Sequence, residues 1–65
     1  MSADKILEEL RGGRKEISQL RTILKNEGMS ERVIEETLHL LQIQGKADSY
    51  LDIETGWTMW RIGRG

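Results

Sequence analysis

The chain has 65 residues, no cysteine, and a formal net charge of −1 from ten basic and eleven acidic side chains. This length predicts one domain with a small core, and the lack of cysteine excludes disulfides and thiolate metal sites. The balanced charge lacks the strongly basic surface of an avid nucleic-acid binder, and no apolar run suits a membrane span or a secretory signal, so we expect an intracellular, cytoplasmic protein.

The first predicted element is an amphipathic helix that begins with Ser2 as a candidate N-cap and ends at the glycine pair Gly12 and Gly13. Its apolar stripe consists of Ile6, Leu7 and Leu10. The next residues, 14–17, are predicted to form a short bridge with one or two residues of strand.

Two further helices follow, each with a serine at its predicted start and a glycine at its predicted end. Ser18 and Gly28 bound the second helix, whose apolar stripe is Leu20, Ile23 and Leu24. Ser30 and Gly45 bound the third. Met29 and Ile34 stand at the two positions of a hydrophobic staple around the Ser30 cap. The buried stripe of the third helix is predicted to be Ile34, Thr37, Leu38 and Leu41.

From Lys46 onward the apolar period changes from that of a helix to that of a strand. Residues 46–53 alternate as a half-buried strand, residues 54–56 supply a turn, and residues 57–62 are rich in strand-forming side chains. The alternation places Thr58, Trp60 and Ile62 on one face of the second strand. We therefore expect Trp60 in the core and Trp57 on the outside.

The elements together predict an α+β fold in which a three-helix cluster is closed by a C-terminal β-hairpin. The predicted order is helix, short strand, helix, helix, strand, strand, in a single domain over residues 1–62 with a flexible tail at 63–65. The centre of the core is predicted to be Leu20, Ile34, Leu38, Leu41 and Trp60.

This pattern resembles the winged-helix, or winged helix-turn-helix, superfamily over essentially the whole chain. The most specific stretch is the spacing Ile34, Leu38, Leu41, Gly45 and Lys46. Many transcription regulators and accessory domains of replication proteins share this fold. The resemblance therefore implies a module that binds DNA or acts beside it, in transcription or replication.

The end of the chain looks like that of Z-DNA-binding (Z-alpha) domains, which finish their wing with Trp, a basic residue and Ile, here Trp60, Arg61 and Ile62. In that family the reading helix also carries a Lys, an Asn and a Tyr. The matching positions here are Glu31, Glu35 and His39, and the wing lacks the paired prolines. C-terminal winged helices of replication proteins are similar in shape, and some of them dock proteins.

A DNA-binding role predicts contacts from three regions of the fold. On the third helix Arg32 and His39 would face the major groove, and on the second helix and at the root of the hairpin basic side chains would contact phosphates. A basic side patch would form if the short strand lies beside the last strand. The complete set of candidates is Arg32, His39, Arg21, Lys25, Lys46, Arg14, Lys15 and Arg61.

The third helix, however, carries three glutamates against one arginine, which opposes phosphate binding. The alternative is a protein-docking module that uses this acidic face and an exposed tryptophan, a residue enriched at binding hot spots. Its candidates are Glu31, Glu35, Glu36 and Trp57. An equal alternative for Trp57 is packing against Tyr50 across the hairpin.

No nucleophile, second histidine or phosphate-cradling glycine loop accompanies His39, so the sequence predicts neither a catalytic site nor a metal or cofactor site. The partner is therefore expected to be DNA or a protein, with no membrane contact. The sequence leaves both a monomer and a dimer open.

Overall fold

The computed structural model describes residues 2–63, apart from the side chain of Ser2. The elements are α1 (Ser2–Arg11), β1 (Lys15–Glu16), α2 (Ile17–Asn26), α3 (Glu31–Ile43), β2 (Ala47–Asp52) and β3 (Trp57–Ile62). The predicted α+β class and the predicted order of elements are confirmed. The cap predicted at Ser2 and residues 64–65 of the predicted tail lie outside the described part.

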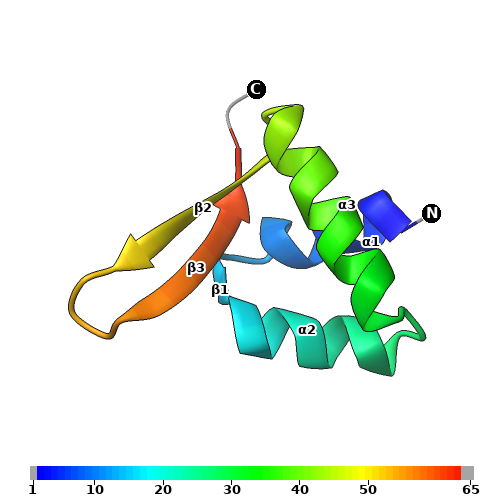
Figure 1. Cartoon of the computed structure of the whole chain (residues 1–65), viewed down its shortest axis with the longest axis horizontal. Helices are drawn as coiled ribbons and strands as arrows, with labels where there is room; N and C mark the ends of the chain where they lie inside the picture. The colour runs from blue at the N-terminus through cyan, green and yellow to red at the C-terminus, as the bar shows by residue number, and fades with distance from the viewer. Residues whose placement is uncertain (1, 64–65) are drawn as a thin grey trace.

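Three helices gather on one side of a three-stranded antiparallel sheet with the order β1-β3-β2 (Figure 1). The hairpin formed by β2 and β3 extends away from the helices, and its turn lies at the far end of the molecule. β3 is the central strand, so β1 and β2 are both edge strands. This order places the beginning of α2 at the sheet, beside the base of the hairpin.

The helix ends follow the local chemistry of the sequence at three of the predicted residues. Ser30 caps α3 by accepting a hydrogen bond from the backbone N–H of Val33 at 3.3 Å. Gly28 and Gly45 have φ angles of 92° and 75°, and each follows its helix in the left-handed conformation that glycine tolerates. The N–H of Met29 bonds to the carbonyl of Leu24 at 3.0 Å, which completes a Schellman motif.

The predicted cap of α2 at Ser18 is wrong, because Glu16 holds that position. Glu16 has extended backbone angles, and its carboxylate accepts the backbone N–H of Ser18. The same residue ends β1, so strand and helix join without a loop. Ser18 thus lies in the first turn of the helix, where its carbonyl accepts a bond from the Thr22 hydroxyl.

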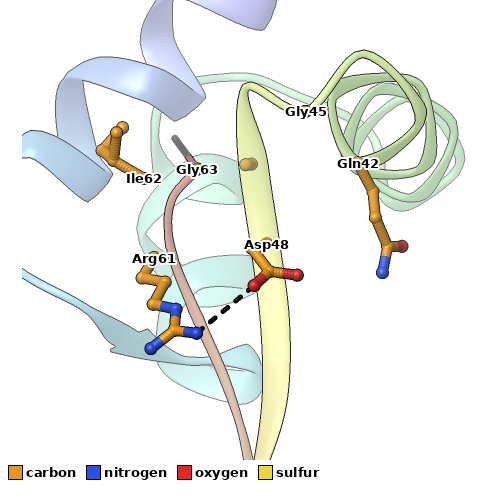
Figure 2. Close-up of a pocket in the computed structure, with 7 residues that line it drawn as sticks. Gln42, Gly45, Asp48, Arg61, Ile62 and Gly63 are labelled. Carbon is orange, nitrogen blue, oxygen red and sulfur yellow. Dashed lines mark hydrogen bonds and ion pairs between the residues drawn. The ribbon is translucent and has the colours of Figure 1, made fainter. Parts of the chain in front are cut away.

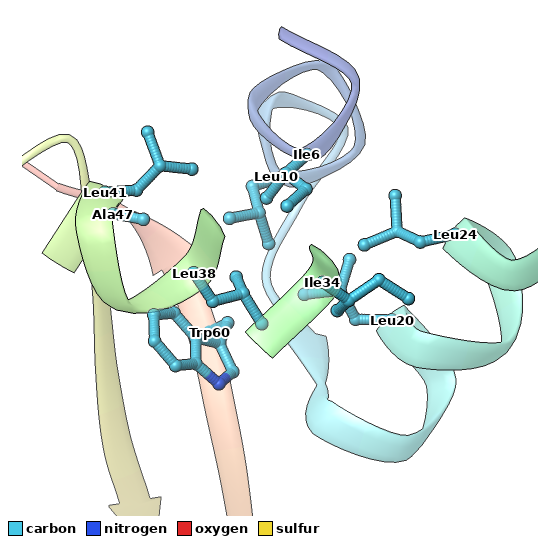
Figure 3. Close-up of a cluster of buried hydrophobic side chains, with 9 residues drawn as sticks. All are labelled: Ile6, Leu10, Leu20, Leu24, Ile34, Leu38, Leu41, Ala47 and Trp60. Carbon is cyan, nitrogen blue, oxygen red and sulfur yellow. The ribbon is translucent and has the colours of Figure 1, made fainter. Parts of the chain in front are cut away.

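The core lies between the helices and the inner face of the sheet (Figure 3). It is formed by Ile6, Leu10, Leu20, Leu24, Ile34, Leu38, Leu41, Ala47 and Trp60. All five residues predicted at its centre are buried, and Trp60 contributes its ring from β3 with 8% of its surface exposed. A large aromatic side chain buries roughly 150–250 Å², so Trp60 contributes most of the apolar area that packs the hairpin against the helices.

The two faces of the hairpin follow the predicted alternation. On the inner face Ser49 pairs with Trp60 and Leu51 with Thr58, whereas on the outer face Tyr50 pairs with Met59. Only the base of the inner face is covered by helices, so Leu51 remains 64% exposed. Gly63, which is predicted to lie in the flexible tail, is held at the base of the hairpin, since it donates its N–H to the carbonyl of Lys46 at 2.9 Å.

Candidate functional site

The outward surface of α2 and α3 is a network of ion pairs. Arg21 of α2 lies 3.0 Å from Glu35 and 3.9 Å from Glu31, both on α3, and Lys25 lies 3.7 Å from Glu31. The network forms because the turn after Gly28 brings the two helices together with opposite charges on their facing sides. The network brings together Arg21 and Lys25, which were predicted to bind DNA, and Glu31 and Glu35, which were predicted to dock a protein.

Arg32 does not enter this network and pairs along its own helix. Its Nε lies 3.1 Å from the carboxylate of Glu36, four residues later. The Arg32 side chain is 87% exposed, and that of Glu36 is 67% exposed. Pairs with this much exposure contribute about 0–1 kcal/mol each, so they shape the surface charge more than they stabilise the fold.

A hollow of about 380 Å³ lies between α2, α3 and the inner face of β3. Its apolar floor comes from Ile17, Leu38 and Trp60, and its polar wall includes Arg21 and His39. The Nε of Arg21 is buried and has no hydrogen-bond partner within residues 2–63. The hollow therefore combines an apolar floor with polar side chains, one of which, Arg21, is already ion-paired, and we name it the α3–hairpin hollow.

The outer face of the sheet carries a cluster centred on Tyr50. Arg14 donates from Nη1 to the Tyr50 hydroxyl at 2.9 Å, and the Arg61 guanidinium lies 4.6 Å from the centre of the ring. Arg61 also reaches Asp48, with Nη2 and Oδ2 3.4 Å apart (Figure 2). Figure 2 shows this pair joining β2 and β3 at the wall of a second hollow, of about 510 Å³, at the base of the hairpin.

Lys15 is separated from the Tyr50 cluster by the alternation of the strand. In the sheet Lys15 pairs with Trp60, so its side chain belongs to the inner face, whereas Arg14 and Arg61 share the outer face. The predicted basic side patch is thus divided between two faces. Lys46 lies elsewhere again, exposed in the turn between α3 and β2.

The candidates for protein docking are likewise divided. Glu31 and Glu35 lie on α3 beside α2, and Glu36 lies next to Arg32. Trp57 begins β3 at the hairpin turn, at the opposite end of the molecule from the start of α3 (Figure 1). Trp57 is 55% exposed as predicted, but it does not share a surface with the glutamates.

Comparison with protein-family models, with curated proteins and with solved structures gave no match to this chain. Within residues 2–63 no group of three His, Asp or Glu side chains could hold a metal ion, and no described helix is long and apolar enough to cross a membrane.

Sequence reasoning missed the role of Tyr50, which it considered only as a neighbour for Trp57. The available signal was the alternation of the hairpin, which puts Tyr50 and Arg61 on the same outward face. It also missed the pairing of the α2 cations with the α3 glutamates. There the signal was the opposite charge of two helices joined by a short turn.

Proposed function

We propose that the chain is a non-catalytic winged-helix module that docks a basic protein surface on the outward face of α3. The order of helices and strands and the β1-β3-β2 sheet support a winged helix. The observation that carries the proposal is the pairing of Arg21 and Lys25 with the carboxylates of Glu31 and Glu35.

This pairing matters because DNA affinity comes mainly from cations that replace the counterions of phosphates. In a helix-turn-helix, α2 would supply such cations, yet here their charge is already balanced by α3. The carboxylates of Glu35 and Glu36, which pair with Arg21 and Arg32 but stay more than half exposed, would then meet the phosphates of DNA. A protein surface with lysine and arginine gains from the same carboxylates, especially where it excludes water.

A double variant, Glu35→Lys with Glu36→Lys, tests the proposal. Proteins retained by the immobilised chain would be identified by mass spectrometry, purified, and measured by calorimetry against each variant. We expect the double variant to lose the partner, because two carboxylates become cations. The matched control, Asp4→Lys with Glu8→Lys, changes two exposed acidic residues of α1 and should keep the partner.

The same variants distinguish a protein ligand of α3 from a DNA ligand. If DNA were the ligand of α3, the Glu35→Lys, Glu36→Lys variant would bind duplex DNA more tightly than the wild type. We expect no change in the amide resonances of α3 when duplex or single-stranded DNA is added at low salt. Resonances of α3 that move with DNA would contradict protein docking.

A second candidate function is weak binding of nucleic acid on the outer face of the sheet. It is favoured by the convergence of Arg14 and Arg61 on Tyr50, which combines two cations with an aromatic ring. Asp48, which pairs with Arg61, opposes it. In the DNA titration this function would move the resonances of β1, β2 and β3 and leave those of α3 unchanged.

A further inference from the structure

The two edges of the sheet differ in how well they are protected against a further strand. β1 has only two residues and passes directly into α2, so it offers almost no free edge. β2 has six residues, and its one-to-one register with β3 contains no bulge. Proteins protect exposed edges with short strands, bulges, prolines or lysines. β2 contains no proline and no lysine, and its outer half extends away from the helices (Figure 1). It is therefore an open edge.

The hydrogen bonds of the hairpin show which backbone groups of β2 face β3. Gly63 donates to the carbonyl of Lys46, so these two residues occupy a hydrogen-bonded position of the antiparallel ladder. Hydrogen-bonded and non-hydrogen-bonded positions alternate along such a ladder. The register therefore directs the backbone groups of every second residue of β2 to β3, namely those of Asp48, Tyr50 and Asp52.

The residues between them turn their backbone groups to the free edge. The N–H and C=O groups of Ser49 and Leu51 point away from β3, and within residues 2–63 no other strand pairs with this side of β2. α3 contacts the base of this strand, where Gln42 donates from Nε2 to the Ser49 hydroxyl at 3.3 Å. Only another extended polypeptide presents donors and acceptors at the repeat of this edge.

The charge beside the edge selects the chemistry of such a polypeptide. The outer face of β2 carries the carboxylates of Asp48 and Asp52, and no Lys or Arg lies between Lys46 and Arg61. Arg61 pairs with Asp48 at 3.4 Å, whereas Asp52 has no ion pair among residues 2–63. A second copy of β2 would add further carboxylates here, whereas a cationic strand neutralises them.

We propose that an extended, cationic segment of another protein adds to the free edge of β2 as a further strand. The added strand is antiparallel to β2, the more stable arrangement per residue. Residues directly opposite each other share a face, so the segment carries cationic side chains opposite Asp48 and Asp52 and apolar ones opposite Ser49 and Leu51. Leu51, which is 64% exposed, is then covered by an apolar neighbour. In strand addition the main chain supplies affinity and alternate side chains supply specificity.

A hexapeptide of alternating lysine and valine, acetylated and amidated, tests the proposal with the full chain. It buries less than the roughly 800 Å² per partner of a standard interface, so we expect a Kd of about 0.1–1 mM. At a peptide concentration about ten times the Kd, hydrogen exchange of the Ser49 and Leu51 amides should slow about tenfold. The amides of Asp48, Tyr50 and Asp52 already bond to β3 and should keep their exchange rates.

Two methylated peptides test the pairing of the backbones. Opposite Ser49 and Leu51 the valine N–H groups of the peptide donate to β2, whereas its lysine N–H groups point away. N-methylation of the valines should therefore lower the affinity by at least about tenfold, because it removes these donors and places methyl groups against the edge. The matched control is N-methylation of the lysines, which should keep the affinity within about threefold.

Asp52→Asn tests the charge preference and keeps a side-chain oxygen to accept the N–H of Glu54. It should weaken binding of the lysine–valine peptide about threefold, the effect of one opposite-charge pair between strands. The control Asp4→Asn removes the same charge from an exposed position of α1 and should bind like the wild type. A peptide of alternating glutamate and valine should bind at least about tenfold more weakly than the lysine–valine peptide, because its carboxylates repel those of β2.

Three outcomes would overturn the proposal. One is that millimolar lysine–valine peptide leaves the amides of Ser49 and Leu51 unchanged, and another is that both methylated peptides lose affinity equally. The third is protection of these two amides that rises with the concentration of the chain alone, which would place a second copy at the edge. None of these outcomes bears on docking at Glu35 and Glu36, because strand addition at β2 goes beyond that proposed function.

Discussion

Arg14 reaches across the central strand of the sheet to Tyr50. Its Nη1 donates to the Tyr50 hydroxyl at 2.9 Å, from the residue before β1 to the middle of β2, while Arg61 of β3 covers the ring between them. One tyrosine thus links all three strands on the outer face. This contact helps to hold β1, and with it the start of α2, against the hairpin.

Tyr50→Phe should therefore destabilise the fold by about 0.5 kcal/mol, because it removes the acceptor for Arg14 and keeps the ring for Arg61. Tyr50→Ala should cost about 0.5–1 kcal/mol more, from the lost stacking with Arg61. Urea unfolding measures both. In an Arg14→Ala background Tyr50→Phe should be almost neutral, and an equal cost in both backgrounds would show that the hydrogen bond contributes nothing.

Gly63 should be intolerant of any side chain. A Cβ at this position would lie 2.3 Å from the carbonyl oxygen of Gly45 and 3.1 Å from the backbone nitrogen of Ala47, and backbone atoms cannot move aside cheaply. We expect Gly63→Ala to cost about 1–3 kcal/mol, the usual cost of overpacking, and to lose hydrogen-exchange protection of its own amide.

Gly12→Ala is the control for that experiment. Its Cβ would lie 3.4 Å from the carbonyl oxygen of Glu9, at the edge of ordinary contact. The free energy of unfolding should change little. If Gly12→Ala and Gly63→Ala were equally destabilising, the close approach of Gly63 to Gly45 would not be the cause.

The two tryptophans should differ sharply in their contribution to stability. Trp60→Ala should cost about 3–5 kcal/mol, because the ring fills the space between hairpin and helices. A domain of this size has a total stability of only about 3–10 kcal/mol, so much of the protein would unfold. Trp57→Ala should change stability by about 0.5 kcal/mol or less, as for other surface positions.

Circular dichroism during thermal unfolding would record this contrast. Fluorescence gives a second measurement, because the emission left in Trp57→Ala comes from buried Trp60 and should be shifted to the blue of the emission left in Trp60→Phe. Emission maxima that coincide would contradict the burial of Trp60 and the exposure of Trp57.

The helix caps give a prediction in which similar serines behave differently. Ser30→Ala should destabilise the protein by about 1 kcal/mol, because it removes the acceptor for the N–H of Val33. Ser18→Ala should be nearly neutral, since Glu16 already accepts at that helix. Glu16→Ala should cost more than Ser18→Ala, and the reverse order in chemical denaturation would contradict the assigned cap.

A structural feature can be predicted from the sequence when it depends on residues that are close together in the chain. The spacing of Ile34, Leu38 and Leu41 determines which face of α3 is buried, because the helical period alone places them on one side. The alternation of the hairpin does the same for Trp60 and Trp57. Residues with positive φ, such as Gly28 and Gly45, mark the helix ends, because other side chains are strained there.

The cap of α2 shows where a local rule fails. Serine is favoured at N-caps and glutamate is not, so the sequence predicts Ser18. The pairing of β1 with β3 sets Glu16 in an extended conformation at the end of a strand, from which its carboxylate reaches the first turn of the helix. A tertiary contact thus decided the helix start.

The charge of the candidate site was decided in the same way. The sequence determined that the chain has α2 cations and α3 glutamates, and that Trp57 points outward. Only the tertiary structure decided that Arg21 and Lys25 lie against Glu31 and Glu35, and that Lys15 and Arg14 occupy opposite faces of the sheet. Local periodicity fixes the face of an element on which a side chain lies, whereas the balance of charges on a surface depends on which elements meet.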